Sequence, residues 1–242
     1  MKLHDLLIER IDLSKPTMID FKGHQWLPVS GELAGQGIQA RVYKTGSGVV
    51  TKVAVLDDEL GLRDPAVKFL DIILQHQDNP FFPRIYHARV YRDKEGILDP
   101  ILIVQMEKLM KLTDPKIEDA SADLLDQLGI GTTELSQHFK DHVKKSDWSK
   151  STKRIMTKTS ALNQKMMKLA MDGDANAIAK LGSRSKNPKF REALKLLAPT
   201  MAKEGSDLHH GNWMVRLTGA GPQLVIIDPF TSSTDANFGF RQ

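Results

Sequence analysis

The chain has 242 residues, of which 40% are hydrophobic and 26% are charged, as is typical of a globular protein with a substantial core. It contains no cysteine, which excludes disulfides and thiolate chemistry, and no apolar run approaches the length of a bilayer-spanning helix. The N-terminus is amphipathic and charged and lacks the apolar core of a signal peptide, so we expect a cytoplasmic protein with no membrane partner.

The net charge of +4 is unevenly distributed along the chain. Between Lys140 and Lys195 there are fifteen Lys and Arg residues against five Asp and Glu, and the rest of the chain is mildly acidic. Such a segment either binds an acidic partner or forms a solvated helical face. Aromatic residues for base stacking are sparse in it (Phe139, Trp148 and Phe190), so a nucleic acid is a weaker expectation than an acidic protein.

The first half of the chain predicts strands and one helix. Residues 1–20 have the pattern of a short helix and a linker, and residues 25–55 predict three antiparallel strands with a glycine-rich first turn. A helix should begin at Asp64-Pro65, because aspartate caps helices well and proline suits the first helical position. Two more strands are predicted, at Ile85–Tyr91 and Ile101–Met106.

The second half of the chain predicts helices and a terminal hairpin. Residues 116–204 show helical spacing almost throughout, with breaks at glycines and at Asn187-Pro188. After them, the apolar runs Trp213–Leu217 and Gln223–Ile227 flank the Gly/Pro turn Thr218–Pro222, which is a hairpin pattern. The predicted fold class is therefore α+β.

Three oxygen-bearing side chains flank this hairpin. Asp207 and Asn212 lie in the polar loop that precedes it, which reads Asp-Leu-His-His-Gly-Asn, and Asp228 ends its second strand. Hard divalent cations and phosphoryl-transfer centres both use oxygen ligands near a carboxylate, so we predict one site here. His209 and His210 lack a third nitrogen ligand at useful spacing, and we expect a histidine to brace the loop by hydrogen bonding.

Two features of the β-rich part could bind a phosphate. Gly35-Gln36-Gly37 lets the backbone approach an anion closely, although paired glycines also serve turn geometry alone. Lys52 lies in the apolar run Val49–Val55, where an inward ammonium needs an anionic partner. Alternatively, Lys52 faces solvent on an exposed side of the sheet.

Together these elements resemble the protein kinase superfamily, in the order glycine turn, strand lysine, helix, Asp-x-His-x-x-Asn loop and Ile-Asp-Pro strand end. The loop and the Asp-Pro pair are most similar to the early Ser/Thr protein kinases of T7-type bacteriophages. Similar loops occur among atypical and small-molecule kinases. The resemblance spans about Gly31–Phe230, and only the terminal hairpin is specific.

The resemblance implies a two-lobed, kinase-like fold with an antiparallel β-sheet N-lobe containing one helix and a reduced, mainly helical C-lobe. The corresponding domains are an N-terminal helix and linker at 1–24, an N-lobe at 25–109 and a C-lobe at 110–242. The implied cofactors are ATP and Mg²⁺, and the implied place of action is a bacterial or phage-infected cytoplasm.

The resemblance also implies a role for each site residue. Asp207 matches the catalytic aspartate, and Asn212 and Asp228 match the magnesium ligands. The nucleotide would be bound by Gly35 and Gly37 of the glycine loop, by Lys52 at the phosphates, and by the backbone of Gln105 and Glu107 in a hinge at Ile103–Leu109. The helix carboxylate that pairs with Lys52 would be Asp71, which is one methylene shorter than the usual glutamate, or Glu59, which precedes the helix.

The chain departs from the kinase pattern in three places. Gly205-Ser206-Asp207 stands where His-Arg-Asp is usual, Asp228-Pro229-Phe230 replaces Asp-Phe-Gly, and only fourteen residues follow Asp228, which leaves no long activation segment. We expect a Ser/Thr protein kinase acting on a host or acidic protein. The alternatives are a small-molecule kinase that resembles aminoglycoside phosphotransferases, and a binding module that uses the basic segment 140–195.

Overall fold

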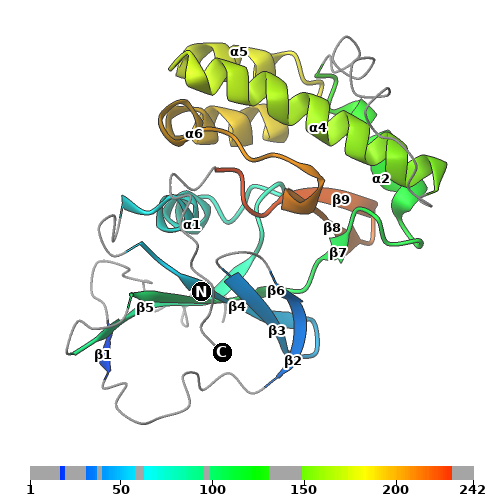
Figure 1. Cartoon of the computed structure of the whole chain (residues 1–242). Coiled ribbons are helices and arrows are strands. Elements are labelled where there is room, and N and C mark those ends of the chain that lie inside the picture. The colour runs from blue at the N-terminus through cyan, green and yellow to red at the C-terminus, as the bar shows by residue number, and fades with distance from the viewer. Residues whose placement is uncertain are drawn as a thin grey trace, which may run out of the picture. The chain divides into compact units, whose positions relative to one another are not determined.

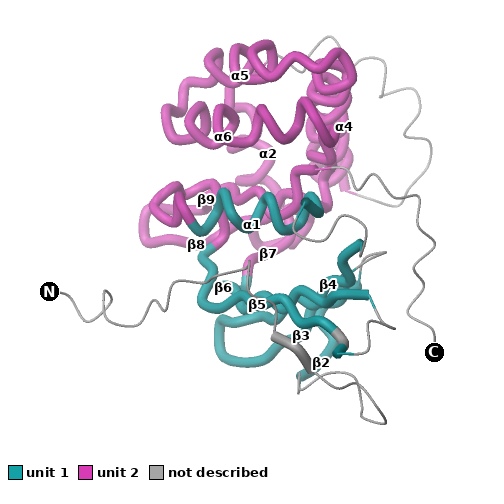
Figure 2. Tube along the Cα trace, turned by 90° about the vertical axis from the view of Figure 1, so that its left-hand side faces the viewer, with its two compact units in different colours: residues 1–74, 84–108, 234–242 teal, residues 75–83, 109–233 magenta. Residues whose placement is uncertain are grey.

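The computed structural model describes residues 17–19, 31–36, 40–57, 63–94, 99–130 and 149–230. These residues form two compact units, which Figure 2 shows in different colours. Unit 1 comprises the described residues of Met1–Leu74 and Arg84–Lys108, and unit 2 comprises those of Gln75–Pro83 and Leu109–Ser233. Each unit contains both helices and strands, so the predicted α+β class is confirmed.

Unit 1 is built on a sheet whose six described strands run in the order β1-β5-β6-β4-β3-β2 (Figure 1). The strands are β1 (Thr17–Ile19), β2 (Glu32–Gln36), β3 (Ala40–Gly46), β4 (Val49–Val55), β5 (Ile85–Asp93) and β6 (Ile101–Glu107). Strands β2 to β6 pair antiparallel, as predicted. The central strand β6 lies between β4 and β5.

Strand β1 corrects one expectation. Residues 17–19 were expected to belong to a linker, but they form a parallel edge strand on β5. The reason is that β5 offers unpaired backbone groups at its outer edge, and the β-favouring sequence Thr-Met-Ile can pair with them. The predicted helix in residues 1–20 otherwise lies outside the described residues.

The helix of unit 1, α1 (Pro65–Gln75), begins where the sequence predicts. The Oδ1 atom of Asp64 accepts a hydrogen bond of 2.8 Å from the backbone N–H of Ala66, which caps the helix. The buried side chains of α1 recur at helical spacing, so they form one apolar face. This face packs on the sheet. The core of this contact consists of Ala54, Leu56, Val67, Leu70, Ala88, Val90, Leu102 and Val104.

Unit 2 contains the predicted helices and hairpin. The helices are α2 (Glu118–Gln127), α4 (Lys150–Met171), α5 (Ala175–Ser183) and α6 (Pro188–Glu204), and α4, α5 and α6 lie side by side in Figure 1. The hairpin of β8 (Trp213–Thr218) and β9 (Gly221–Ile226) gains a third strand, β7 (Met110–Lys111), which the sequence did not indicate. None of the described helices combines the length and the hydropathy that a bilayer crossing requires.

Part of the basic segment is neutralised within unit 2. The Nη2 atom of Arg154 on α4 donates to Asp123 at 3.1 Å and to Asp126 at 2.6 Å, both on α2. Lys158, one turn further along α4, forms an ion pair with the same Asp126. These pairs hold the N-terminal half of α4 on α2 and neutralise two of the positive charges of the basic segment.

The segment between α1 and β5 belongs to unit 2. Arg216 on β8 donates from Nη1 to the carbonyl oxygen of Pro80 at 3.0 Å and from Nη2 to that of Phe82 at 2.8 Å. The N–H of Ile226 donates to the carbonyl oxygen of Phe81 at 2.8 Å. The predicted N-lobe at 25–109 includes residues 75–83, whereas these bonds join them to the terminal hairpin.

Aromatic side chains complete the same contact. Phe190 on α6 is fully buried, with its ring centroid 5.0 Å from that of Phe81 and 6.0 Å from that of Trp213. Tilted pairs at these distances add to the free energy gained from burial. One ring of α6 therefore joins segment 75–83 to the first residue of β8.

The chain crosses from unit 1 to unit 2 after Lys108, close to the predicted boundary between lobes. The functional division into lobes at 25–109 and 110–242 stays a prediction.

We predict that Phe190→Ala lowers the free energy of unfolding by about 3–5 kcal/mol, because it leaves a cavity between two fixed rings. Denaturant unfolding followed by tryptophan fluorescence measures this change. Tyr86→Ala is a suitable control, because Tyr86 is 54% exposed and should change stability by less than about 0.5 kcal/mol. Equal midpoints for wild type and Phe190→Ala would contradict the assignment of this core.

Candidate functional site

The loop that carries Asp207 lies between α6 and β8. Helix α6 (Pro188–Glu204) is followed by Gly205, whose φ of 91° lies in the region that favours glycine. Ser206 follows, fully buried and bridged to Phe230 beyond the second hairpin strand. A short 3-10 turn, η3 (His210–Asn212), leads directly into β8. The glycine and the turn therefore set where the polar loop begins and ends.

Two backbone hydrogen bonds bring this loop against the strand end that carries Asp228. The N–H of Asp207 donates to the carbonyl oxygen of Pro229 at 2.9 Å, and the N–H of Ile227 donates to that of Asn212 at 3.1 Å. These bonds flank Asp228 on both sides. The structure therefore brings Asp207, Asn212 and Asp228 together within unit 2.

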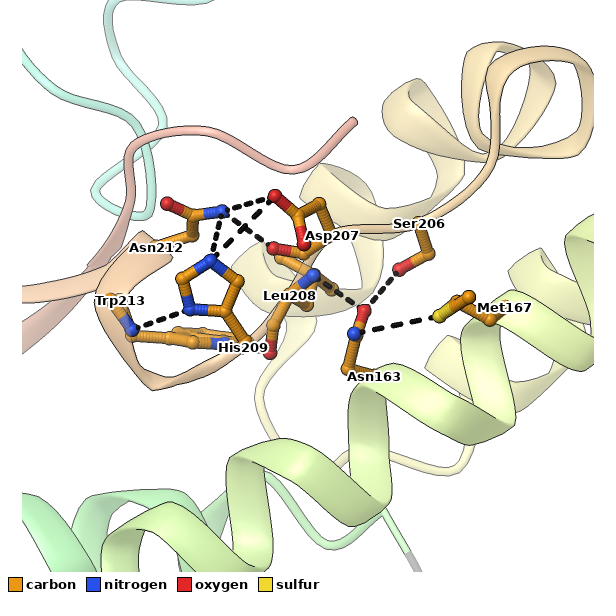
Figure 3. Close-up of polar contacts among 9 residues, drawn as sticks. Asn163, Met167, Ser206, Asp207, Leu208, His209, Asn212 and Trp213 are labelled. Carbon is orange, nitrogen blue, oxygen red and sulfur yellow. Dashed lines mark hydrogen bonds and ion pairs between the residues drawn. The ribbon is translucent and has the colours of Figure 1, made fainter. Parts of the chain in front are cut away.

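Asn212 connects the parts of this site. Its Nδ2 donates to the carbonyl oxygen of Asp207 at 2.7 Å and to the carboxylate Oδ2 of Asp207 at 3.0 Å (Figure 3). Both amide protons are thus used, and Oδ1 of Asn212 accepts no hydrogen bond from any described residue. An amide oxygen beside a carboxylate is the hard donor set that suits Mg²⁺. The described residues contain no cluster of three or more His, Asp or Glu side chains arranged to hold a metal, so further ligands would come from a substrate or from water.

His209 braces the loop, as the sequence analysis expected of a histidine. Its Nδ1 accepts a hydrogen bond of 2.9 Å from the N–H of Gly211, so the proton of the neutral ring lies on Nε2. Nε2 lies 3.7 Å from Oδ2 of Asp207 and 3.3 Å from Nδ2 of Asn212. The ring therefore lies against both polar side chains of the loop.

The pKa of Asp207 is raised by this environment. Burial of the carboxyl is the largest cause, and the negative charge of Asp228 adds to it. His209 and the hydrogen bond from Asn212 act in the opposite direction. A carboxylate with increased proton affinity is better suited to accept a proton from a substrate hydroxyl than an ordinary surface aspartate.

Two further residues, Asn163 and Trp213, hold this loop through hydrogen bonds that the sequence did not indicate. The Oδ1 atom of Asn163 on α4 accepts hydrogen bonds from the N–H of Leu208 at 2.7 Å and from the hydroxyl of Ser206 at 3.2 Å. The indole Nε1 of Trp213 donates to the carbonyl oxygen of Leu208 at 3.0 Å. An asparagine inside a long helix was the one available signal, because asparagine is a poor helix former.

The phosphate-binding candidates lie on the sheet of unit 1. Lys52 is half-buried in the middle of β4, between Val42 on β3 and Val104 on β6. Gly35 lies on β2, opposite Val42 and next to an irregularity in the register, and not in a turn. Gly37 lies outside the described residues. Phosphate binding by these residues stays a prediction.

The structure does not pair Asp71 with Lys52. Burial is the cause that raises the pKa of the Asp71 carboxyl, whereas a neighbouring lysine would lower it. In the part of the chain that the structure describes, Asp71 forms no ion pair.

The predicted hinge residues continue the sheet. Gln105 lies between Thr51 and His87 in the ladders of β6 with β4 and β5. The N–H of Glu107 donates to the carbonyl oxygen of Arg84 at 3.0 Å, so this donor is already used within unit 1. Adenine contacts at Gln105 and Glu107 stay a prediction.

We predict that Gly211→Ala displaces the imidazole of His209. A Cβ atom at position 211 would lie 2.7 Å from Cε1 of that ring, which is closer than carbon atoms approach. The ring must move, and the bond from the backbone N–H to Nδ1 is then lost. Two-dimensional NMR of the imidazole signals measures the change. Gly219→Ala is the matched control, because nothing lies within 4 Å of a Cβ there, and equal spectra for both variants would contradict the prediction.

We predict that Asp207→Asn is more heat-stable than wild type at neutral pH. The folded state raises the pKa of Asp207 above its unfolded value near 4, so the ionised carboxylate disfavours folding. Wild type therefore loses stability as the pH rises from about 4 through the folded pKa, and the variant does not. The difference in Tm should vanish near pH 3, where the Asp207 carboxyl of the wild type is protonated in both the folded and the unfolded state. Asp172→Asn, at the exposed end of α4, serves as the control, and a Tm difference for Asp207→Asn that persists at low pH would refute this account.

Comparison of the sequence with protein-family models and with curated proteins found no match.

Proposed function

We propose that this chain is an ATP-dependent phosphotransferase with a kinase-like two-lobed fold, and that its acceptor is a Ser or Thr hydroxyl of a protein. The observation that carries the proposal is the hydrogen-bonded arrangement of Asp207, Asn212 and Asp228 in unit 2. A base and two oxygen ligands on neighbouring backbone segments are what phosphoryl transfer requires.

Each residue has a distinct task in this reaction. The hydroxyl oxygen of the acceptor attacks the terminal phosphorus of ATP while the bond to the leaving oxygen of ADP breaks, and Asp207 accepts the hydroxyl proton. Asn212 keeps the Asp207 carboxylate oriented through its two hydrogen bonds. Lys52 orients the phosphates of the nucleotide. Oδ1 of Asn212 and the carboxylate of Asp228 would hold magnesium, which would neutralise the phosphate charge.

The surface of α4 to α6 favours an acidic protein as the acceptor. Several exposed cations of these helices and of the connection between α5 and α6 form no ion pair with a described residue, namely Lys150, Lys168, Lys180, Arg184, Lys186 and Lys195. Unpaired positive charge attracts acidic surfaces and raises association rates at low ionic strength. A cationic small molecule such as an aminoglycoside would be repelled by the same charge.

We predict that incubation with labelled ATP, Mg²⁺ and a bacterial cytoplasmic extract labels acidic host proteins. Asp207→Asn should lower the rate at least about 100-fold, because a general base contributes about 10²- to 10⁴-fold. Asp228→Ala should lower the rate to a similar extent, because it removes a ligand of the magnesium ion. Asp172→Asn, on an exposed turn, is the matched control and should retain the wild-type rate.

Two other outcomes would replace the proposal. Transfer to aminoglycosides but not to any protein would indicate a small-molecule kinase. Retained, salt-sensitive binding of an acidic protein with no transfer at all would indicate a binding module. Undiminished labelling by Asp207→Asn would exclude Asp207 as the base.

A further inference from the structure

Asn163 reaches the candidate site from a distant part of the chain. It lies in the middle of α4, between the buried residues Leu162 and Met166 on the helix. Its side chain points away from the helix axis toward the loop, as Figure 3 shows. Asparagine is unfavourable at such a position, because its side chain competes with helical hydrogen bonds. Hydrogen bonds of the side chain to groups outside the helix offset this cost.

Every backbone polar group of Asp207 and Leu208 has a hydrogen-bond partner. Asp207 donates to Pro229 and accepts from Asn212, whereas Leu208 donates to Asn163 and its carbonyl oxygen accepts from Trp213. In three of these four bonds, one of the two partners is a side chain. The bond to Asn163 is the only one of the four that ties the loop to α4.

We propose that Asn163 is a positioning residue for Asp207. Its Oδ1 holds the groups on both sides of that aspartate, namely the hydroxyl of Ser206 and the N–H of Leu208. Fixing both neighbours fixes the direction in which the Asp207 carboxylate projects. The catalytic part of this inference rests on the proposed phosphotransfer, and the structural part does not.

The alternative is that Asn163 only stabilises the packing of α4. Other contacts already provide that, because Ile155, Leu162 and Met166 are buried and the ion pairs of Arg154 and Lys158 hold the helix on α2. Removal of Asn163 should therefore leave α4 in place. What it removes is the acceptor of a buried N–H, since Leu208 is fully buried. The loop must then shift to find another partner.

A small shift is enough to slow a reaction that depends on geometry. A misplacement of about 1 Å at a catalytic group can reduce the rate about 100-fold. We therefore expect Asn163→Leu to lower kcat about 10- to 100-fold. The KM for ATP should change less than about twofold, because Asn163 contacts no residue assigned to the nucleotide.

The experiment compares four variants of the full chain. Asn163→Leu removes the acceptor, and Asn163→Asp keeps an oxygen in reach of Leu208. Ser206→Ala removes only the longer of the two bonds. Met167→Leu is the matched control, because the thioether of Met167 accepts from Nδ2 of Asn163 on the side away from the loop. If Asn163→Leu does not fold, Asn163→Ser replaces it, since a serine hydroxyl is too short to reach the loop.

Two readouts are measured on each variant. The first is kcat and KM for phosphoryl transfer, and the second is the hydrogen-exchange rate of the Leu208 amide by NMR. The inference expects faster exchange and lower kcat in Asn163→Leu, recovery of both in Asn163→Asp, and wild-type values in Met167→Leu.

Wild-type kcat together with unchanged exchange in Asn163→Leu would overturn the inference. A loss of kcat that Asn163→Asp does not restore, accompanied by unchanged exchange, would also overturn it. If wild type transfers no phosphate, the proposed function fails, and the catalytic role of Asn163 fails with it. The exchange rate would then still show whether Asn163 holds the loop, so the two failures can be told apart.

Discussion

The structure of unit 2 depends on one constraint, which is that the loop backbone at Asp207 and Leu208 is irregular and yet lies inside the protein. Irregular backbone has no ladder of its own, so each N–H and C=O that is removed from water needs a specific partner. Here the partners come from a helix residue, Asn163, from the first strand of the hairpin, Trp213, and from the segment after Asp228. Each must be in place before the loop can adopt one conformation. The geometry of the candidate site is therefore a property of the whole unit and not of the hexapeptide alone.

The aromatic core extends this dependence. Trp213 can donate to Leu208 only if its indole is held, and Phe190 on α6 packs against it. Phe190 in turn packs against Phe81. The chain of contacts therefore runs from segment 75–83 through α6 to the loop that carries Asp207. The half-buried carboxylate of Asp207 at the end of these contacts disfavours folding when it is ionised.

The sequence predicted what is encoded locally. Alternating apolar residues around a Gly/Pro turn predicted the hairpin of β8 and β9, and the hairpin predicted that Asp207, Asn212 and Asp228 meet. Asp64-Pro65 likewise predicted the start of α1. The contact of Asn163 with Leu208 spans 45 positions and leaves no local pattern. Asp71 forms no ion pair with a described residue, and the adenine contacts expected of Gln105, which lies inside a sheet ladder, stay a prediction. A short motif specifies neither strand pairing nor side-chain contacts between distant elements.

The membership of residues 75–83 in unit 2 has a consequence for any attempt to take the protein apart. A fragment that begins at Leu109 would lack the ring of Phe81 and the carbonyl groups that receive Arg216. The guanidinium of Arg216 would then lose two hydrogen bonds, and the aromatic core would lose the ring of Phe81. A fragment that ends at Lys108 would carry the same segment with nothing to cover it. The two units are thus interleaved along the chain, and neither is a cassette that a single cut can release. Exchange of unit 2 between chains would have to transfer the nine residues from Gln75 to Pro83 together with Leu109–Ser233.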